Sequence, residues 1–136
     1  MKIEKQVCSL SQAKKLKELG IEQVGYFSHQ HYPKTSYRNE AQEVVNPLFK
    51  EGATDAGEWF SAFTLSELGA MLDSETYTQR TGSEDSKYAN WEWINDGNET
   101  GSGLFGYEVF ARADMLINCL ESGSLSAETC NKRLLA

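Results

Sequence analysis

The chain has 136 residues and a formal net charge of −7, with 40% of its residues hydrophobic and 24% charged. This length and composition predict one globular domain that spans residues 1–136. The negative charge argues against a nucleic-acid partner, because an exposed phosphate backbone repels an acidic surface.

The sequence also predicts a compartment. No apolar run approaches the roughly 20 residues that a membrane helix needs, and the opening MKIEKQV lacks the apolar core of a signal peptide. Cys8, Cys119 and Cys130 cannot all pair within one chain, and their spacing matches no metal or redox motif. We therefore expect a cytoplasmic protein with reduced thiols and no membrane partner.

The first part of the chain predicts a helix and a strand. Residues 2–8 alternate weakly, which is typical of a short edge strand or a tail. Ser9 has the character of an N-cap, apolar residues then recur at helical spacing, and Gly20 stands where a left-handed C-cap is needed. These signals predict a helix over 9–19, and the alternation after it predicts a strand over 21–31.

The middle of the chain is less regular. We interpret residues 34–57 as a long connection, in which a short helix over 40–49 would be interrupted by Pro47. Residues 58–63 are rich in aromatic side chains and predict a short strand. Thr64 and Glu67 then form a capping box, which begins a helix over 64–72.

The last third predicts a hairpin and two helices. Residues 73–87 have the polar composition of a loop. Strands over 88–94 and 104–110 would pair through a turn that contains Asp96-Gly97. Apolar residues at helical spacing then predict a helix over 111–122, with Cys119 on its apolar face and in the core of the domain. Ser126 begins a final helix that reaches Leu135.

These elements predict an α+β fold. We expect a mostly antiparallel sheet of three to five strands, with the helices at 9–19, 64–72 and 111–122 packed largely on one face.

Aromatic side chains are the main candidates for a binding site. Trp59, Tyr88, Trp91 and Trp93 fall on or next to predicted strands. Trp91 and Trp93 share one face of their strand, so they either form an exposed recognition patch or cover the sheet beneath the connection at 34–57. We favour the second arrangement, because large aromatic residues dominate the cores of small domains.

Candidates for catalysis are weaker. His29 and His31 would point to the same side of a strand, which a metal site can use, but no third or fourth ligand stands at a telling distance. The glycine-rich stretch 97–106 lacks the lysine and the following helix of a phosphate-binding loop. Glu92 and Glu108 would lie on neighbouring strands without a cleft, and Arg112 is expected to be a salt-bridge partner.

Three sets of segments carry a resemblance, with the patterns CSL..A..LKELG, AFT..ELG.ML and ARA.MLI. They lie at 7–20, 62–72 and 111–117. In these segments, about a third of the chain, the protein resembles small uncharacterised proteins that are encoded by phages and mobile elements of gut bacteria. The resemblance implies a fold of capped helices, and it implies no activity, cofactor or catalytic residue.

Two classes of function follow from the sequence. The first, which we favour, is a non-catalytic binding or protein-interaction module without a cofactor. It would use the aromatic residues Trp59, Tyr88, Trp91 and Trp93, or the long connection at 34–57. Its partner would be another protein or a second copy in a symmetric dimer. The alternative is a small metal-dependent or hydrolytic enzyme that uses His29 and His31.

Overall fold

The computed structural model describes residues 2–32, 42–47, 59–73, 76–81, 90–95, 99–100 and 105–136. Its helices are the 3-10 helix η1 (Ile3–Lys5) and the α-helices α1 (Leu10–Glu18), α2 (Leu65–Met71), α3 (Glu108–Ser122) and α4 (Ala127–Leu135). Its strands are β1 (Phe27–Tyr32), β2 (Gln42–Pro47), β3 (Trp59–Ser61), β4 (Thr76–Thr81), β5 (Asn90–Asn95) and β6 (Glu99–Thr100).

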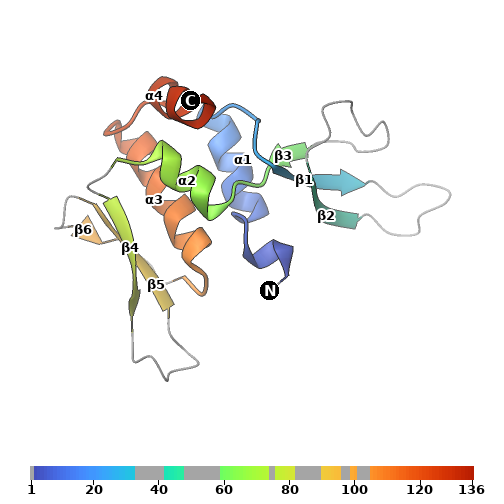
Figure 1. Ribbon diagram of the computed structural model, residues 1–136, viewed down its shortest axis with the longest axis horizontal. Helices are drawn as coiled ribbons and strands as arrows, with labels where there is room; N and C mark the ends of the chain where they lie inside the picture. Colours follow the sequence, from blue (N-terminus) through green and yellow to red (C-terminus); the bar gives the residue numbers. More distant parts are fainter. Residues whose placement is uncertain are drawn as a thin grey trace.

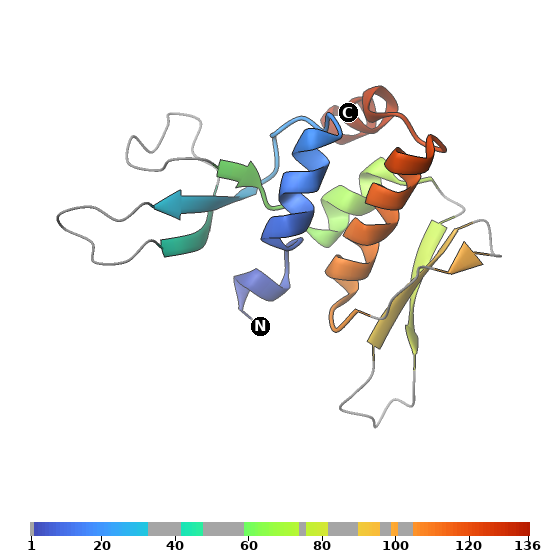
Figure 2. The same ribbon diagram turned by 180° about the vertical axis from the view of Figure 1, so that it is seen from behind.

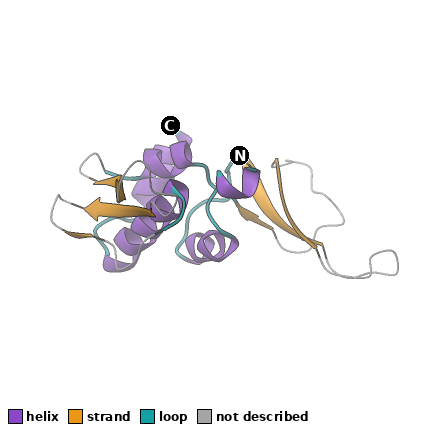
Figure 3. Ribbon diagram, turned by 90° about the horizontal axis from the view of Figure 1, so that it is seen from below, coloured by secondary structure: helices purple, strands orange, loops and turns teal. Residues whose placement is uncertain are grey.

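The predicted α+β class and the antiparallel pairing are confirmed. The strands are divided between two sheets, sheet 1 with the order β2-β1-β3 and sheet 2 with the order β4-β5-β6, whereas the sequence predicted a single sheet. The helices lie between the two sheets (Figures 1 and 2). Figure 3 shows the same arrangement from below, with the helices flanked by strands on both sides.

The central helix α3 explains why the strands separate. Its buried residues are Val109, Ala111, Ala113, Met115, Leu116 and Cys119. These positions cover more than one stripe of the helix, so α3 is buried on several sides at once. It contacts α1, α2, β4 and β5, while sheet 1 packs against α1 through β3.

Local capping signals correctly located the starts of three helices. Ser9 and Gln12 form a capping box at α1, and Thr64 and Glu67 form one at α2. Ser126 caps α4 by accepting a hydrogen bond from the Thr129 N–H. Each cap satisfies backbone N–H groups that the first helical turn cannot pair.

The predicted strand over 104–110 is wrong. Helix α3 already begins at Glu108, after Tyr107 in an extended conformation. Among the described residues of this segment, 105–110, only Phe105 pairs with β5, through an isolated bridge to Trp91. The alternation of Phe105, Tyr107 and Val109 matches a strand pattern by chance. Glu108 is favourable in the first turn of α3, because a carboxylate stabilises the positive end of the helix dipole.

Four further expectations also differ from the structure. The segment 2–8, predicted as a short edge strand or a tail, contains helix η1. Residues 42–47, within the predicted long connection, form β2, and the predicted loop 73–87 contains β4. In β2 and β4, β-branched residues such as Val44, Val45 and Thr78 favour the extended backbone. The strand predicted over 21–31 begins only at Phe27.

The core lies among the helices. Phe63, Leu16, Leu68, Met71, Met115 and Leu116 are the largest fully buried apolar side chains, and Cys119 is buried with them as predicted. In the described residues, no helix combines the length and the apolar character that a membrane span requires.

Candidate binding site

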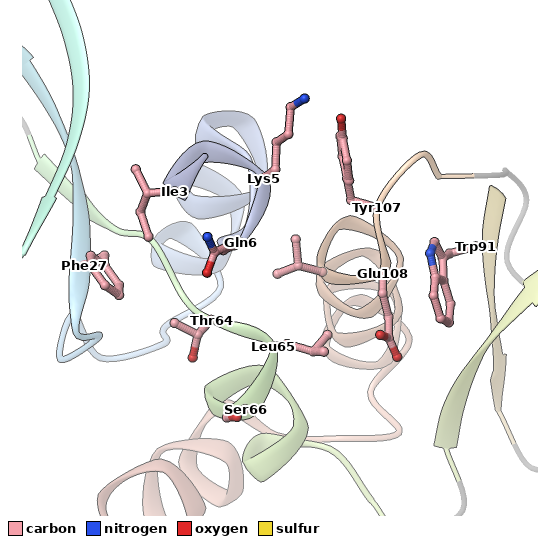
Figure 4. Close-up of a pocket in the computed structure, with 11 residues that line it drawn as sticks. Ile3, Lys5, Gln6, Phe27, Thr64, Leu65, Ser66, Trp91, Tyr107 and Glu108 are labelled. Atoms are coloured by element: carbon pink, nitrogen blue, oxygen red, sulfur yellow. The ribbon is translucent and has the colours of Figure 1, made fainter. Parts of the chain in front are cut away.

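A cavity of about 430 Å³ opens where the first turns of α2 and α3 approach helix η1 and strand β5. We call it the Trp91 cavity. Its lining residues are Ile3, Lys5, Gln6, Phe27, Thr64, Leu65, Ser66, Trp91, Tyr107, Glu108 and Val109. Figure 4 shows Phe27 and Trp91 at opposite ends, with Leu65 and Glu108 between them. Its volume is within the range typical of ligand sites.

Two isolated backbone bridges assemble this cavity from distant parts of the chain. Val7 pairs with Thr64, and the Cys8 N–H donates to the Phe63 carbonyl at 2.9 Å, which brings η1 to the start of α2. Trp91 pairs with Phe105, with N···O distances of 2.6 and 2.9 Å, which brings the start of α3 to β5. The cavity therefore depends on pairings that no local pattern indicates.

The charged groups of the cavity are already engaged by neighbours. The Lys5 ammonium lies 5.4 Å from the centre of the Tyr107 ring, a cation–π contact. The Glu108 carboxylate accepts hydrogen bonds from the Thr78 hydroxyl at 2.7 Å and from the Arg112 guanidinium at 3.2 Å. The predicted role of Arg112 as a salt-bridge partner is confirmed. Glu92 instead accepts a hydrogen bond from Gln79, so the two acids do not form a pair.

The two neighbouring tryptophans of β5 have different environments. Trp93 is only 3% exposed, and its indole N–H donates to the Asp114 carboxylate of α3 at 2.8 Å. An exposed patch that includes Trp93 is therefore wrong. The favoured alternative placed both tryptophans over the sheet beneath the connection at 34–57; Trp93 is buried as that alternative requires, but helix α3 covers it. Trp91 is half-buried and lines the cavity.

The other two aromatic candidates do not join this site. Trp59 is 37% exposed and belongs to sheet 1, where the Lys17 ammonium lies 5.8 Å from its ring centre. Figure 1 places β3 and β5 on opposite sides of the helices. Tyr88 lies outside the described residues. Of the three predicted binding residues that the structure describes, only Trp91 lines the cavity.

Of the two histidines, the structure describes the side chain of His29, which contacts the backbone. The His29 Nε2 atom lies 2.7 Å from the backbone oxygen of Cys8, and because a carbonyl only accepts, Nε2 must carry the hydrogen. The side chain of His31 lies outside the described part of the chain. Within that part, no group of three His, Cys, Asp or Glu residues is arranged to hold a metal ion.

Cys8 is buried beside these groups, and its thiol is unreactive in character. Its side chain is fully buried, and the Sγ atom lies 4.0 Å from the Ser61 carbonyl. Burial raises the pKa of the Cys8 thiol from 9.0 to about 12. The neutral thiol is a poor nucleophile, since the thiolate is the reactive form.

This raised pKa predicts a loss of stability at alkaline pH. Above pH 9 the unfolded chain loses the Cys8 proton while the folded chain keeps it, so the free energy of unfolding should fall by about 1.4 kcal/mol per pH unit up to about pH 12. Urea unfolding at pH 8 and pH 10 measures the difference. The variant Cys8→Ala should lose less stability over the same interval, and an equal loss in both proteins would contradict the assignment.

The sequence did not indicate most residues of the cavity. Ile3, Lys5 and Phe27 have no neighbouring motif, and Glu108 was assigned to a strand. Two local signals pointed near the cavity. One was the aromatic residue Trp91 on an alternating strand, and the other was the capping box at Thr64, which located the first turn of α2.

Comparison with known proteins adds no relative: no protein-family model matches the chain, and no curated protein or solved structure is significantly similar to it.

Proposed function

We propose that this protein is a non-catalytic interaction module that binds a segment of a partner protein in the Trp91 cavity. The observation that carries the proposal is the cavity itself, which apolar side chains from separate segments line together with the half-buried Trp91. Tryptophan in a partly desolvated pocket is among the residues that most often dominate the energy of protein interfaces. The engaged charges of Glu108 and Arg112 leave the cavity without an isolated buried charge.

The cellular setting belongs to the same proposal. We infer a cytoplasmic accessory protein of a phage or mobile element, on the basis of the sequence resemblance in the helical segments. All three cysteines are buried thiols and form no disulfide with one another, which is consistent with a reducing compartment.

The test compares two tryptophans of the same chain. The full-length protein, Trp91→Ala and Trp59→Ala serve as baits in a pull-down from lysate of the host cell, with bound proteins identified by mass spectrometry. We expect a partner that the natural protein and Trp59→Ala retain and that Trp91→Ala loses. Light scattering on each bait identifies a symmetric dimer, which could hide the same surface.

Two outcomes would contradict the proposal. A partner that persists on Trp91→Ala would show that the cavity is not the binding surface. A partner that Trp59→Ala loses and Trp91→Ala keeps would place the surface on sheet 1, around Trp59 and the neighbouring Lys17.

A further inference from the structure

A second cavity lies close to the Trp91 cavity, because Arg112 of the one donates a hydrogen bond to Glu108 of the other. It has a volume of about 440 Å³ and lies between α2 and β4. Helix α2 contributes Gly69, strand β4 contributes Thr76, Tyr77 and Thr78, and helix α3 contributes Arg112 and Met115. Both cavities are thus lined by α2 on one side, by sheet 2 on the other and by α3 between them.

A polar bridge stands between the two cavities. Arg112 lines the second cavity, and its guanidinium donates to Glu108 of the Trp91 cavity at 3.2 Å. It also donates to the Leu65 carbonyl at 3.2 Å and to the Thr78 hydroxyl at 3.3 Å. The side chains of Arg112 and Glu108 are 23% and 27% exposed, so solvent reaches the bridge. The two cavities have no described lining residue in common, and this bridge lies between them beside α3.

Strand β4 is an edge strand that lines the second cavity. Thr76, Tyr77 and Thr78 all line that cavity, so it lies against the first half of the strand. In the described sheet order β4-β5-β6, β4 is terminal, so the backbone groups on its outer side do not pair with another described strand.

The direction of β4 also leads towards Trp91. Thr76 at the start of the strand lines the second cavity, and Arg80 near its end is the cross-strand neighbour of Trp91 on β5. A chain that paired with β4 would extend from the second cavity towards the Trp91 end of the sheet. Six strand residues span about 20 Å, which is the length of such a segment.

We propose that the partner segment binds in extended conformation as an additional strand on the outer edge of β4, with one apolar side chain inserted into the Trp91 cavity. This inference rests on the function proposed above and specifies the kind of partner. Backbone hydrogen bonds to an exposed edge provide affinity, and the pocket for a side chain provides specificity. The net charge of −7 favours a segment that carries lysine or arginine, because long-range attraction accelerates its association.

The probe is a displayed library of random peptides of about 12 residues, twice the length of β4, selected against the immobilised full-length protein. Enriched peptides are synthesised, and their dissociation constants are measured by fluorescence anisotropy. We expect peptides with an aromatic or aliphatic residue and a positive charge, and we expect about tenfold or weaker binding to Trp91→Ala. Trp59→Ala should bind them as the natural protein does.

The decisive measurement is an N-methyl scan of the best peptide. In a strand that pairs on one side only, alternate N–H groups point to the partner. N-methylation should weaken binding about tenfold or more at every second position, because each lost hydrogen bond leaves a carbonyl of β4 unpaired. The intervening positions are the matched controls and should tolerate the same methyl group.

Three results would overturn the inference, and they are distinguishable from failure of the proposed function. Binding that needs Trp91 but shows no period of two in the scan would exclude strand addition and leave the interaction module intact. Failure to enrich any peptide would exclude a short extended segment, while the pull-down decides the proposed function independently. A peptide that binds only after a dimer dissociates, as light scattering would show, would assign the edge of β4 to a second copy of the chain.

Discussion

Replacing Phe63 with alanine is expected to lower the free energy of unfolding by about 3–5 kcal/mol, the usual cost of removing a fully buried phenylalanine. Phe63 has no exposed surface and lies between β3 and α2. A side chain on Gly25 would come within 3.2 Å of its ring, so the packing around it is close. Its carbonyl also holds the Cys8 N–H. The cavity left by alanine would therefore weaken the contact between sheet 1, the N-terminal segment and the helices.

Urea unfolding of the full-length protein, followed by circular dichroism, measures the loss. Tyr26→Ala is the control, because Tyr26 is 75% exposed and its replacement should change the stability by about 0.5 kcal/mol or less. If Phe63→Ala does not fold, Phe63→Leu keeps most of the volume and should cost about 1.5 kcal/mol or less. A loss below about 1 kcal/mol in Phe63→Ala would contradict the position of the core.

The elements that could be predicted are those whose signals are local. Three helix starts could be predicted from their N-cap residues, Ser9, Thr64 and Ser126. Such a cap is visible in the sequence because it is a hydrogen bond between residues three positions apart. Strand β4 was missed because its stability comes from its pairing with β5, and its own sequence resembles a polar loop. Division of the strands into two sheets follows from the packing around α3, which is a property of the whole chain.

For the Trp91 cavity, even fewer features could be predicted from local sequence signals. Trp91 was predicted as a binding residue because an aromatic residue on an alternating strand is visible in the sequence. The different roles of Trp91 and Trp93 could not be predicted, because both residues lie on the same face of an alternating strand. In the structure Trp93 bonds Asp114, whereas Trp91 lies at the start of α3 and lines the cavity. The remaining cavity residues come together through the Val7–Thr64 and Trp91–Phe105 bridges, which join segments with no common periodicity.

Trp93→Ala is expected to have an effect as large as that of Phe63→Ala, about 3–5 kcal/mol, because it removes a buried indole between β5 and α3. The more informative variant is Trp93→Phe. It keeps an aromatic ring in the core but removes the N–H that donates to Asp114, so a half-buried carboxylate loses a partner. We expect this variant to lose about 1–3 kcal/mol. Trp93→Phe/Asp114→Asn should recover part of that loss, because a neutral amide is less costly to leave unpaired than a carboxylate.

Fluorescence distinguishes Trp93 from Trp59, and a binding measurement on Trp93→Phe tests the cavity as the site. Trp93→Phe should remove the blue-shifted emission that acrylamide quenches poorly, whereas Trp59→Phe should remove an accessible component, since Trp59 is 37% exposed and Trp93 is 3% exposed. Under conditions in which it is folded, Trp93→Phe should retain partner binding, because Trp91 and not Trp93 lines the cavity. Binding that is lost in folded Trp93→Phe and kept in Trp91→Ala would show that the interface lies at the contact between β5 and α3. That result would contradict the cavity as the site.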